Sequence, residues 1–176
     1  MFDSCVLFNI DESLKKRLKI FSSSAKIKEK LDFKKTDLVF FSPKTEQDLK
    51  TAVNMALPYG IINSETIHGK DSLHFIKSGI DDSIAKEMGK KKIAIVFNLS
   101  LLLKSAPPKR ALIIRRMKEN MKKAVKFDAP VLFASLAENE YELFNGEQIK
   151  AWAQYFGIDN FSRAKTSFNK IFISKF

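Results

Sequence analysis

The sequence has few of the residues that build disulfides, metal sites and phosphate-binding loops. It contains one cysteine, Cys5, so it cannot form an internal disulfide, and two histidines. A zinc site needs clustered His, Cys or carboxylate ligands, so none is expected. The six glycines are scattered without the spacing of a dinucleotide-binding or P-loop motif. The sequence also lacks a Gly-x-Ser-x-Gly nucleophile elbow.

Segments for membrane insertion are also missing from the sequence. No apolar stretch approaches the ~20 residues that span a bilayer. The first four residues lack the basic region of a signal peptide. Together with the single cysteine, these features predict a cytoplasmic protein in a reducing compartment.

Positive charge is what the sequence has in excess. It carries 31 Lys and Arg against 20 Asp and Glu, a formal net charge of +11. Such an excess indicates a polyanionic partner, either nucleic acid or an anionic membrane surface. No basic helix shows a Trp or Phe insertion face, which favours nucleic acid. The length of 176 residues predicts one domain spanning 1–176.

Strand and helix patterns alternate along the whole sequence, which predicts a parallel α/β fold. Two forms compete: a closed or partly closed (β/α) barrel and an open doubly wound sheet. The absence of a glycine-rich loop argues against the open doubly wound sheet. The chain is also shorter than the ~250 residues of a regular eight-unit barrel. Strands are expected at 2–8, 37–41, 60–63, 73–76, 93–97, 131–135 and 171–173, and helices at 11–19, 45–55, 82–88, 109–127, 147–156 and 161–169.

The helix at 109–127 carries the strongest functional signal. One arc of it is apolar and should face the core, through Ile113, Ile114, Met117, Met121, Ala124 and Val125. The other arc is basic and should face outward, through Arg115, Arg116, Lys118, Lys122, Lys123 and Lys126. Such a face is either an ordinary solvated surface or one that contacts phosphates, and the helix alone does not decide between them.

Candidates for catalysis or metal binding are weak. Ser100 and Ser135 follow predicted strands, where (β/α) enzymes keep their sites, but no histidine is placed beside them. His68 and His74 could approach each other across a turn, although ordinary surface or structural histidines are commoner. The carboxylate pairs Asp81 with Asp82 and Glu138 with Glu140 could bind a divalent ion, but loop carboxylates are common. No catalytic residue and no metal ligand is therefore assigned.

Several stretches resemble one family, the thirty-kilodalton protein subunit of ribonuclease P in its archaeal form, component three. The resemblance rests on the order and spacing of Ser78–Asp81, the strand 93–97 with its continuation Asn98–Leu103, Arg110, Arg115, 130–135, 149–157 and 163–167. It covers the chain well from Ser78 onward and upstream follows mainly the strand order. The chain departs from the family by being trimmed between Asn63 and Leu73 and by having Asn98 at a strand end.

The resemblance implies a compact or incomplete TIM-like barrel of the metal-dependent phosphoesterase (PHP-like) type that has lost its metal ligands. It implies an RNA-binding subunit of ribonuclease P, in which the RNA removes the 5′ leader of precursor tRNA. The protein itself would have no cofactor, and magnesium would be bound by the RNA only. The implied partners are ribonuclease P RNA, precursor tRNA and a small ferredoxin-like protein subunit, together in a heterotetramer.

The resemblance also suggests which residues contact RNA. Arg110, Arg115 and Lys165 match basic family positions, and Ser100 matches a strand-end serine. Further phosphate contacts are expected from Lys104, Lys109, Lys122 and Lys123. Two other functions stay open, an active metal-dependent phosphoesterase on the same fold and a general basic RNA-interaction module. A protein partner would bind exposed phenylalanines, for which the candidates are Phe144, Phe172 and Phe176.

Overall fold

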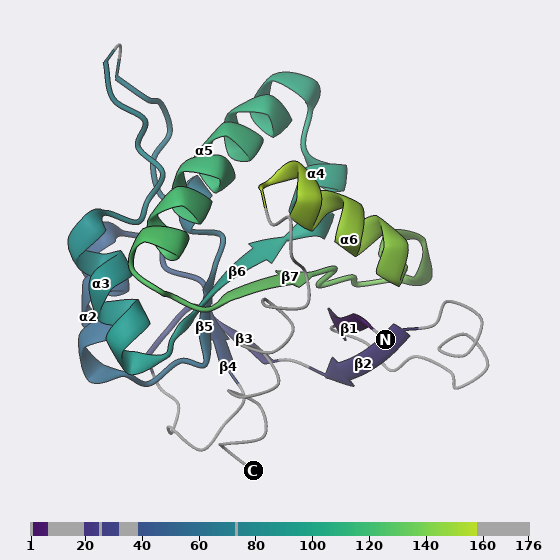
Figure 1. Ribbon diagram of the computed structural model, residues 1–176, viewed down its shortest axis with the longest axis horizontal. Helices are drawn as coiled ribbons and strands as arrows, with labels where there is room; N and C mark the ends of the chain where they lie inside the picture. The colour runs from purple at the N-terminus through teal and green to yellow at the C-terminus, as the bar shows by residue number, and fades with distance from the viewer. Residues whose placement is uncertain (1, 7–19, 25, 32–38, 73, 158–176) are drawn as a thin grey trace.

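The computed structural model describes residues 2–6, 20–24, 26–31, 39–72 and 74–157 (Figure 1). Within these ranges the strands form two parallel sheets. A two-stranded sheet pairs β1 (Phe2–Val6) with β2 (Ile20–Ser24). A five-stranded sheet contains β3 (Lys26–Lys28), β4 (Val39–Phe41), β5 (Gly60–Ile62), β6 (Ala94–Asn98) and β7 (Val131–Ala134).

The strand order decides between the two expected architectures. The five-stranded sheet runs β3-β4-β5-β6-β7, so neighbours in space are also neighbours along the chain. A doubly wound sheet reverses its order at a switch point, whereas the strands of a (β/α) barrel follow the chain. Strand β1 also lies against β7 at the far side of the sheet. The described part is thus an α/β fold with TIM-like strand order.

The described residues form five helices, of which α4 (Leu99–Lys104) was not expected from the sequence. Signals visible in the sequence mark the starts of three others. Thr45 with Asp48, and Asn145 with Gln148, form complete capping boxes at the starts of two of them. Pro107 occupies the first position of the longest, where its missing N–H costs nothing. The helices are α2 (Glu46–Met55), α3 (Asp82–Lys91), α4 (Leu99–Lys104), α5 (Pro107–Lys126) and α6 (Gly146–Tyr155), with short 3-10 turns at Ser64–Thr66 and Glu140–Glu142. None of the described helices is long and apolar enough to cross a membrane.

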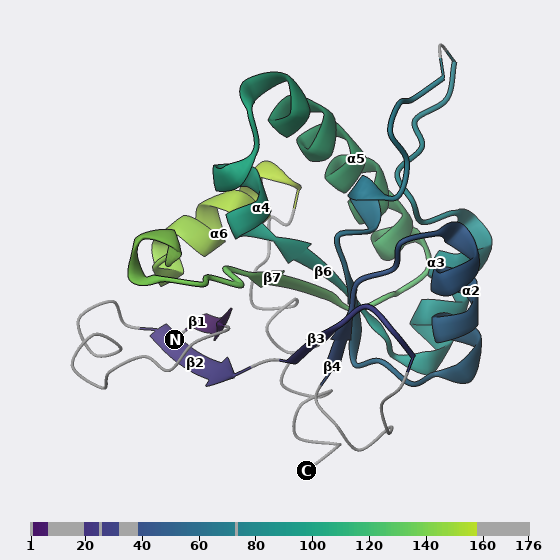
Figure 2. The same cartoon turned by 180° about the vertical axis from the view of Figure 1, so that it is seen from behind.

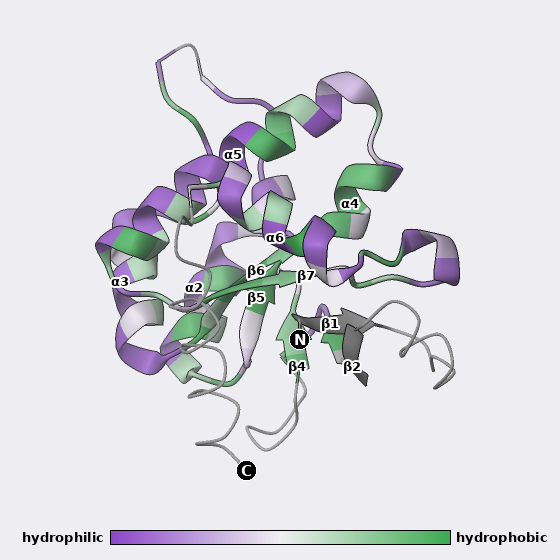
Figure 3. Ribbon diagram, turned by 45° about the vertical axis from the view of Figure 1, so that its right-hand side comes forward, coloured by the Kyte–Doolittle hydropathy of each residue, from purple (hydrophilic) through white to green (hydrophobic). Residues whose placement is uncertain are grey.

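The helices cover one face of the sheet, as the two hydrophobic clusters show. The larger cluster joins strand residues such as Phe41 and Phe97 to residues from all five helices. The smaller one takes the alternate strand residues, including Phe40 and Val96, and contains only strand and loop residues. Figures 1 and 2 show α2, α3 and α5 against the strands, and Figure 3 shows β4, β6 and β7 as mainly hydrophobic. Both faces of the sheet are therefore buried, as parallel sheets require.

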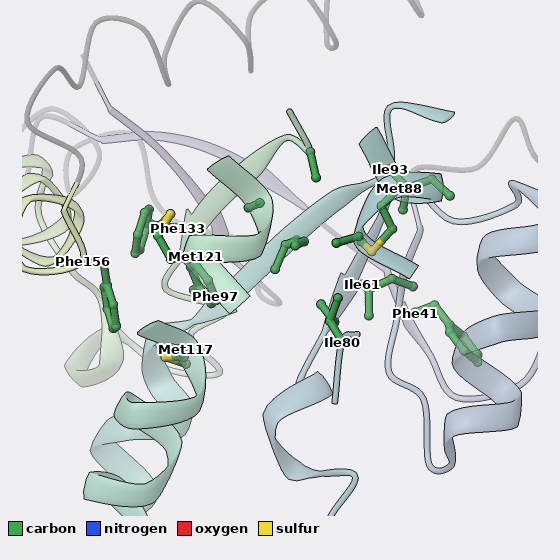
Figure 4. Packing of buried hydrophobic residues seen from close by; sticks show 14 of the residues in the cluster. Phe41, Ile61, Ile80, Met88, Ile93, Phe97, Met117, Met121, Phe133 and Phe156 are labelled. Atoms are coloured by element: carbon green, nitrogen blue, oxygen red, sulfur yellow. The ribbon is translucent and has the colours of Figure 1, made fainter. Parts of the chain in front are cut away.

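Aromatic and sulfur-containing side chains fill the end of the core near β6, β7 and α6. Phe97 stacks on Phe156 with ring centroids 5.6 Å apart and also contacts Phe133 at 5.2 Å (Figure 4). Met117 and Met121 reach this region from α5, and both are almost fully buried. The expected inner face of this helix is confirmed for these two residues.

Three local expectations are wrong. Residues 74–76 do not form a strand, because Ser72 donates two hydrogen bonds to the Phe75 carbonyl and closes a turn there. The helix expected at 82–88 continues to Lys91, so Gly89 lies inside α3. A side chain there would collide with the Phe127 carbonyl, whose oxygen lies 2.2 Å from an added Cβ. Val125 is 72% exposed and not part of the core. It lies at the edge of the apolar arc, beyond the reach of the sheet.

Several expected elements fall outside the described residues. These are the helices at 11–19 and 161–169, the strand at 171–173, and the ends of the strands at 2–8 and 37–41. The candidate interface residues Phe172 and Phe176 also lie there. The third candidate, Phe144, is only 8% exposed, so its expected place in an exposed partner surface is wrong.

The burial of α5 residues generates a stability prediction. Met117→Ala removes a side chain with 0% exposure and should lower the free energy of unfolding by ~2–5 kcal/mol, because it leaves a cavity. Val125→Ala on the same helix removes a 72% exposed side chain and should change it by no more than ~0.5 kcal/mol. Denaturant unfolding of both variants checks this pair. Equal effects would show that α5 is packed differently.

Candidate nucleic-acid interface

The outer face of α5 carries a row of cations. Arg115, Lys118, Lys122 and Lys126 are spaced three, four and four residues apart, which places them within one narrow arc of the helix. We call these four residues the α5 stripe. All but Lys118 are exposed, and Lys118 is half-buried because its Nζ sits 4.0 Å from the centre of the Tyr155 ring. The sequence predicted this outward row correctly.

Ion pairs within the protein already engage two members of the α5 stripe. Lys122 Nζ contacts Glu119 at 2.6 Å, and Lys126 Nζ contacts Asp82 at 2.6 Å. Both lysines stay more than 60% exposed, so these pairs are solvated and contribute little to stability. Arg115 makes no ion pair within the described part of the chain. Its guanidinium is the member of the stripe most open to an external anion.

The predicted contacts at the start of α5 differ in how they are held. Lys109 is exposed and has no ion pair among the described residues. Arg110 is half-buried and donates to the Ser105 carbonyl at 3.0 Å, which ties α5 to the end of α4. Lys104 contacts Glu138 at 2.8 Å and Glu142 at 3.2 Å. The hydrogen bond to Glu138 is the main cause that raises the pKa of Lys104.

Two cations of the predicted outer arc instead point inward. The expectation that Arg116 faces outward is wrong, because its side chain is only 2% exposed. Its Nε and Nη2 donate to Asp71 Oδ1 at 3.0 and 2.7 Å, and its Nη1 donates to the carbonyls of Glu65 and His68 at 2.7 and 2.6 Å. All of these acceptors lie in the segment 64–80, which packs along this flank of the helix.

Lys123 and Asn120 hold the same segment on the same flank. Lys123, expected outside, is half-buried and donates to Ser78 Oγ at 2.8 Å and to the Ile80 carbonyl. Asn120 is fully buried and donates to Glu65 Oε1 at 3.0 Å and to the Ser78 carbonyl at 2.9 Å. Burial lowers the pKa of Lys123, against the pull of nearby carboxylates. Lys123 was predicted to contact RNA, and this burial argues against that contact.

Close packing of the segment 64–80 also explains why residue 79 is a glycine. Gly79 has φ +88°, a backbone conformation that favours glycine, and an added Cβ would come within 2.0 Å of the Ser64 carbonyl oxygen. The segment therefore folds back tightly on itself between β5 and α3. Arg116, Asn120 and Lys123 then fasten it to α5.

The two carboxyl groups of this network are shifted in opposite directions. Burial raises the pKa of Glu65, and hydrogen bonds from Asn120 and Ser64 and the charge of Arg116 oppose it only in part. Burial also opposes ionisation of Asp71, but hydrogen bonds from Arg116 and the Lys77 N–H outweigh it and lower the pKa of Asp71. The charges of Arg116 and Arg115 add to this lowering. Arg116 therefore stabilises the charged form of Asp71, whereas burial disfavours the charged form of Glu65.

The carboxyl ends of the strands carry a row of neutral polar side chains. Asn63 Nδ2 donates to Ser42 Oγ at 3.3 Å, and Asn98 Nδ2 donates to Asn63 Oδ1 at 3.1 Å. Asn98 also accepts from the Leu101 N–H and so caps α4. Ser100 is 2% exposed and donates its hydroxyl hydrogen to the Ser135 carbonyl at 2.5 Å. Ser100 was predicted to contact RNA, and its burial argues against that contact as well.

This strand-end row is chemically different from a catalytic centre. Amides and hydroxyls of this kind hydrogen-bond, but they do not exchange protons near neutral pH. Within the described ranges, no group of three or more His, Cys, Asp or Glu residues is arranged to hold a metal ion. His68 contacts Glu46 at 3.0 Å rather than joining a ligand cluster. The main chemical feature of the described surface is positive charge.

Lys109 and Arg110 lie in the first turn of α5, and the α5 stripe follows further along the same helix. Ser100 is buried and Lys123 is half-buried, so both are withdrawn from the exposed surface. Lys165 lies outside the described residues. Sequence reasoning missed a second group of exposed cations, Lys70 and Lys77, beside Arg115. In the sequence, Asp71 lies between these two lysines and reduces the apparent positive charge of the stretch. In the structure, Arg116 neutralises Asp71.

No protein-family model matches the chain. Curated relatives named "Ribonuclease P protein component 3" are similar to parts of it. The protein of Methanocaldococcus jannaschii is 35% identical over 75 residues, which is 43% of this chain and 32% of that protein. That of Archaeoglobus fulgidus is 30% identical over 80 residues, 46% and 40% of the two chains. That of Methanococcus maripaludis is 29% identical over 139 residues, 69% and 60% of the two chains.

A solved structure has the same fold. A chain in the cryo-EM structure of archaeal ribonuclease P with mature tRNA superposes with a TM-score of 0.71 at 19% identity, over 99% of this chain and 81% of that one. The resemblance stated from the sequence is confirmed by these similarities. The matches to the curated relatives span between 32% and 60% of those relatives' lengths.

The buried guanidinium gives a second prediction. Arg116→Ala leaves Asp71 and two backbone carbonyls without their donor, so the free energy of unfolding should fall by ~3–5 kcal/mol. Arg115→Ala, at the neighbouring exposed position, should change it by no more than ~0.5 kcal/mol. Thermal or denaturant unfolding measures both. A small loss for Arg116→Ala would mean that the segment 64–80 is held by other contacts.

The raised pKa of Glu65 gives a third prediction. Below the ordinary value of 4.5 both the folded and the unfolded protein hold this proton, so the group has no effect on stability. As pH rises above it, the unfolded chain releases the proton first, and the wild-type protein loses stability until the folded pKa is passed. Glu65→Gln removes this loss, so its Tm advantage should grow with pH. The exposed variant Glu140→Gln is the control, and a pH-independent difference for Glu65→Gln would contradict the assignment.

Proposed function

We propose that this chain is an RNA-binding protein subunit of ribonuclease P that supports the catalytic RNA in removing the 5′ leader of precursor tRNA. The similarity to three archaeal proteins named Ribonuclease P protein component 3 is the observation that carries the proposal. The fold shared with a chain of archaeal ribonuclease P is consistent with it. The chemistry of the surface provides independent support.

The surface has the charge that RNA binding requires. The net charge of +11 is large for 176 residues. Part of the positive charge is used inside the fold, where Arg116 and Lys123 donate hydrogen bonds to the segment 64–80. The remainder on α5 faces outward, where each cation that meets a phosphate releases a condensed counterion. Lys109 and Arg115 are the strongest candidates, because they are exposed and make no ion pair within the described residues.

The other proposed contacts rank below these two. Lys118 and Lys122 are on the same stripe and can reach a phosphate from exposed or half-buried positions. Arg110 is half-buried and its Nη2 donates to the Ser105 carbonyl, so only the exposed part of its guanidinium could meet a phosphate. To bind a phosphate, Lys104 would have to break its ion pairs with Glu138 and Glu142. Lys165 is proposed from the family resemblance alone.

The proposal includes the architecture and partners that the resemblance implies. The chain forms a single compact barrel of the PHP-like type, and the sequential strand order with β1 against β7 supports closure. The neutral row of Ser42, Asn63 and Asn98 at the strand ends suits a member of that type without metal ligands. The chain works in the cytoplasm without a cofactor of its own, with a small ferredoxin-like protein subunit in a heterotetramer.

Reconstitution tests the proposal directly. The full chain is added to the ribonuclease P RNA of the same organism and the other protein subunits, at moderate magnesium concentration. Stimulation of precursor-tRNA cleavage over the mixture without this chain is expected. No stimulation, or cleavage and phosphatase activity by the purified chain alone with stoichiometric bound metal, would overturn the proposal.

The exposed arginine gives a fourth prediction. Arg115→Ala should weaken binding of the ribonuclease P RNA and lower the slope of log affinity against log salt by about one unit, because one phosphate contact is lost. Lys50→Ala removes an equally exposed cation on α2 and should leave the slope unchanged. Filter binding or fluorescence anisotropy over a salt series measures both. If the two variants behave alike, α5 is not the RNA-binding face.

A further inference from the structure

The segment 68–77 forms an arm that projects beyond the body of the molecule beside α5 (Figures 1 and 2). All its residues except Leu73 are described. The base of the arm is fixed by Arg116, which holds the His68 carbonyl and the Asp71 carboxylate. Asp71 Oδ1 also accepts from the Lys77 N–H at 3.0 Å, so it ties the two limbs of the arm together. The arm is therefore anchored to a buried residue of α5.

The tip of the arm is closed by its own hydrogen bonds. The N–H and the hydroxyl of Ser72 both donate to the Phe75 carbonyl, at 3.1 and 3.2 Å. This turn presents the Phe75 side chain to solvent, where it is 64% exposed. A large aromatic ring held outward on an anchored turn needs little further ordering to bind a flat partner.

The exposed charged side chains of the arm are all positive. Lys70 and Lys77 are exposed and make no ion pair within the described residues. Asp71, the one acidic residue of the arm, is paired with Arg116 and is 11% exposed. Arg115 lies close enough to Asp71 to contribute to the lowering of its pKa. The arm thus carries an exposed Phe75 and two exposed lysines that make no ion pair within the described residues.

This combination favours RNA over a protein partner. Protein interfaces have an apolar core in which lysine is depleted, but on the arm the one large exposed apolar ring is flanked by lysines. Proteins that bind single-stranded nucleic acid pair a basic surface with aromatic rings on which bases stack. Bases inside an RNA duplex are already stacked, so such a ring binds nucleotides of loops, bulges or single strands.

Building on the proposed function, we propose that the arm docks an unpaired nucleotide of the ribonuclease P RNA or its precursor-tRNA substrate. The base stacks on the ring of Phe75, and Lys70 and Lys77 contact the flanking phosphates. Arg116 does not touch the RNA but positions the arm. The α5 stripe and the arm then form one continuous RNA-binding surface that meets at Arg115.

The test measures RNA affinity of full-length variants over a salt series. Phe75→Ala should weaken binding roughly 5- to 150-fold without changing the salt slope, because stacking releases no counterion. Phe75→Tyr should retain affinity, whereas Phe75→Leu, apolar but not aromatic, should behave like Phe75→Ala. Lys70→Ala and Lys77→Ala should each lower the slope by about one unit. All five substitutions replace one of three exposed side chains, Lys70, Phe75 or Lys77, so thermal unfolding should stay near that of the wild-type protein.

Two controls and one second probe make the outcome decisive. Met55→Ala removes another large exposed apolar side chain, 55% exposed on α2, and should leave affinity unchanged. A single-stranded oligouridine should compete for the wild-type protein better than for Phe75→Ala, and a duplex RNA should compete equally for both. If the wild-type chain does not bind the ribonuclease P RNA or precursor tRNA, the proposed function fails. If it binds and Phe75→Ala matches Met55→Ala, or loses only a protein partner, the arm is not an RNA site.

Discussion

The buried guanidinium of Arg116 is the interaction on which the surface of this protein depends. A buried charge is costly unless it is paired and its donors are satisfied, and Arg116 meets both conditions through Asp71 and the carbonyls of Glu65 and His68. The acceptors all come from the segment between β5 and α3. One side chain of α5 therefore fixes the course of a segment that has little regular secondary structure of its own. It also neutralises the acid that would otherwise reduce the positive charge of the arm.

The cations of α5 are divided by their position around the helix. Arg116 and Lys123 lie on the flank that the segment 64–80 covers, and both donate to its backbone or side chains. The α5 stripe lies about a quarter-turn away and faces solvent. Positive charge on one flank thus builds the fold, and positive charge on the next is available to a polyanion. A tally of basic residues would not separate these roles, although only the second contributes to RNA binding.

Much of the fold could be predicted from local sequence patterns. Buried strands such as β6 were evident as continuous apolar runs, and the capping boxes at Thr45 and Asn145 marked two helix starts within a residue. A strand was expected at 73–76, yet among the described residues of this stretch the Ser72 turn and the pairing of Asp71 place 74–76 in the arm. The partners of Arg116 are 45 to 51 residues away in the sequence, so helical periodicity alone could not indicate that it is buried. The helix expected to end at 88 continues to Lys91 through Gly89, whose close contact with Phe127 is a tertiary feature that the local sequence does not reveal.

The central claim is that α5 and the arm form one RNA-binding surface, and amide hydrogen exchange tests it without any substitution. The exchange of the full chain is compared with and without the ribonuclease P RNA, at low and at high salt. The claim predicts slower exchange in 68–77 and in α5 on RNA binding, and loss of this protection at high salt. Protection confined to α2 or α3, with the arm unchanged, would contradict it.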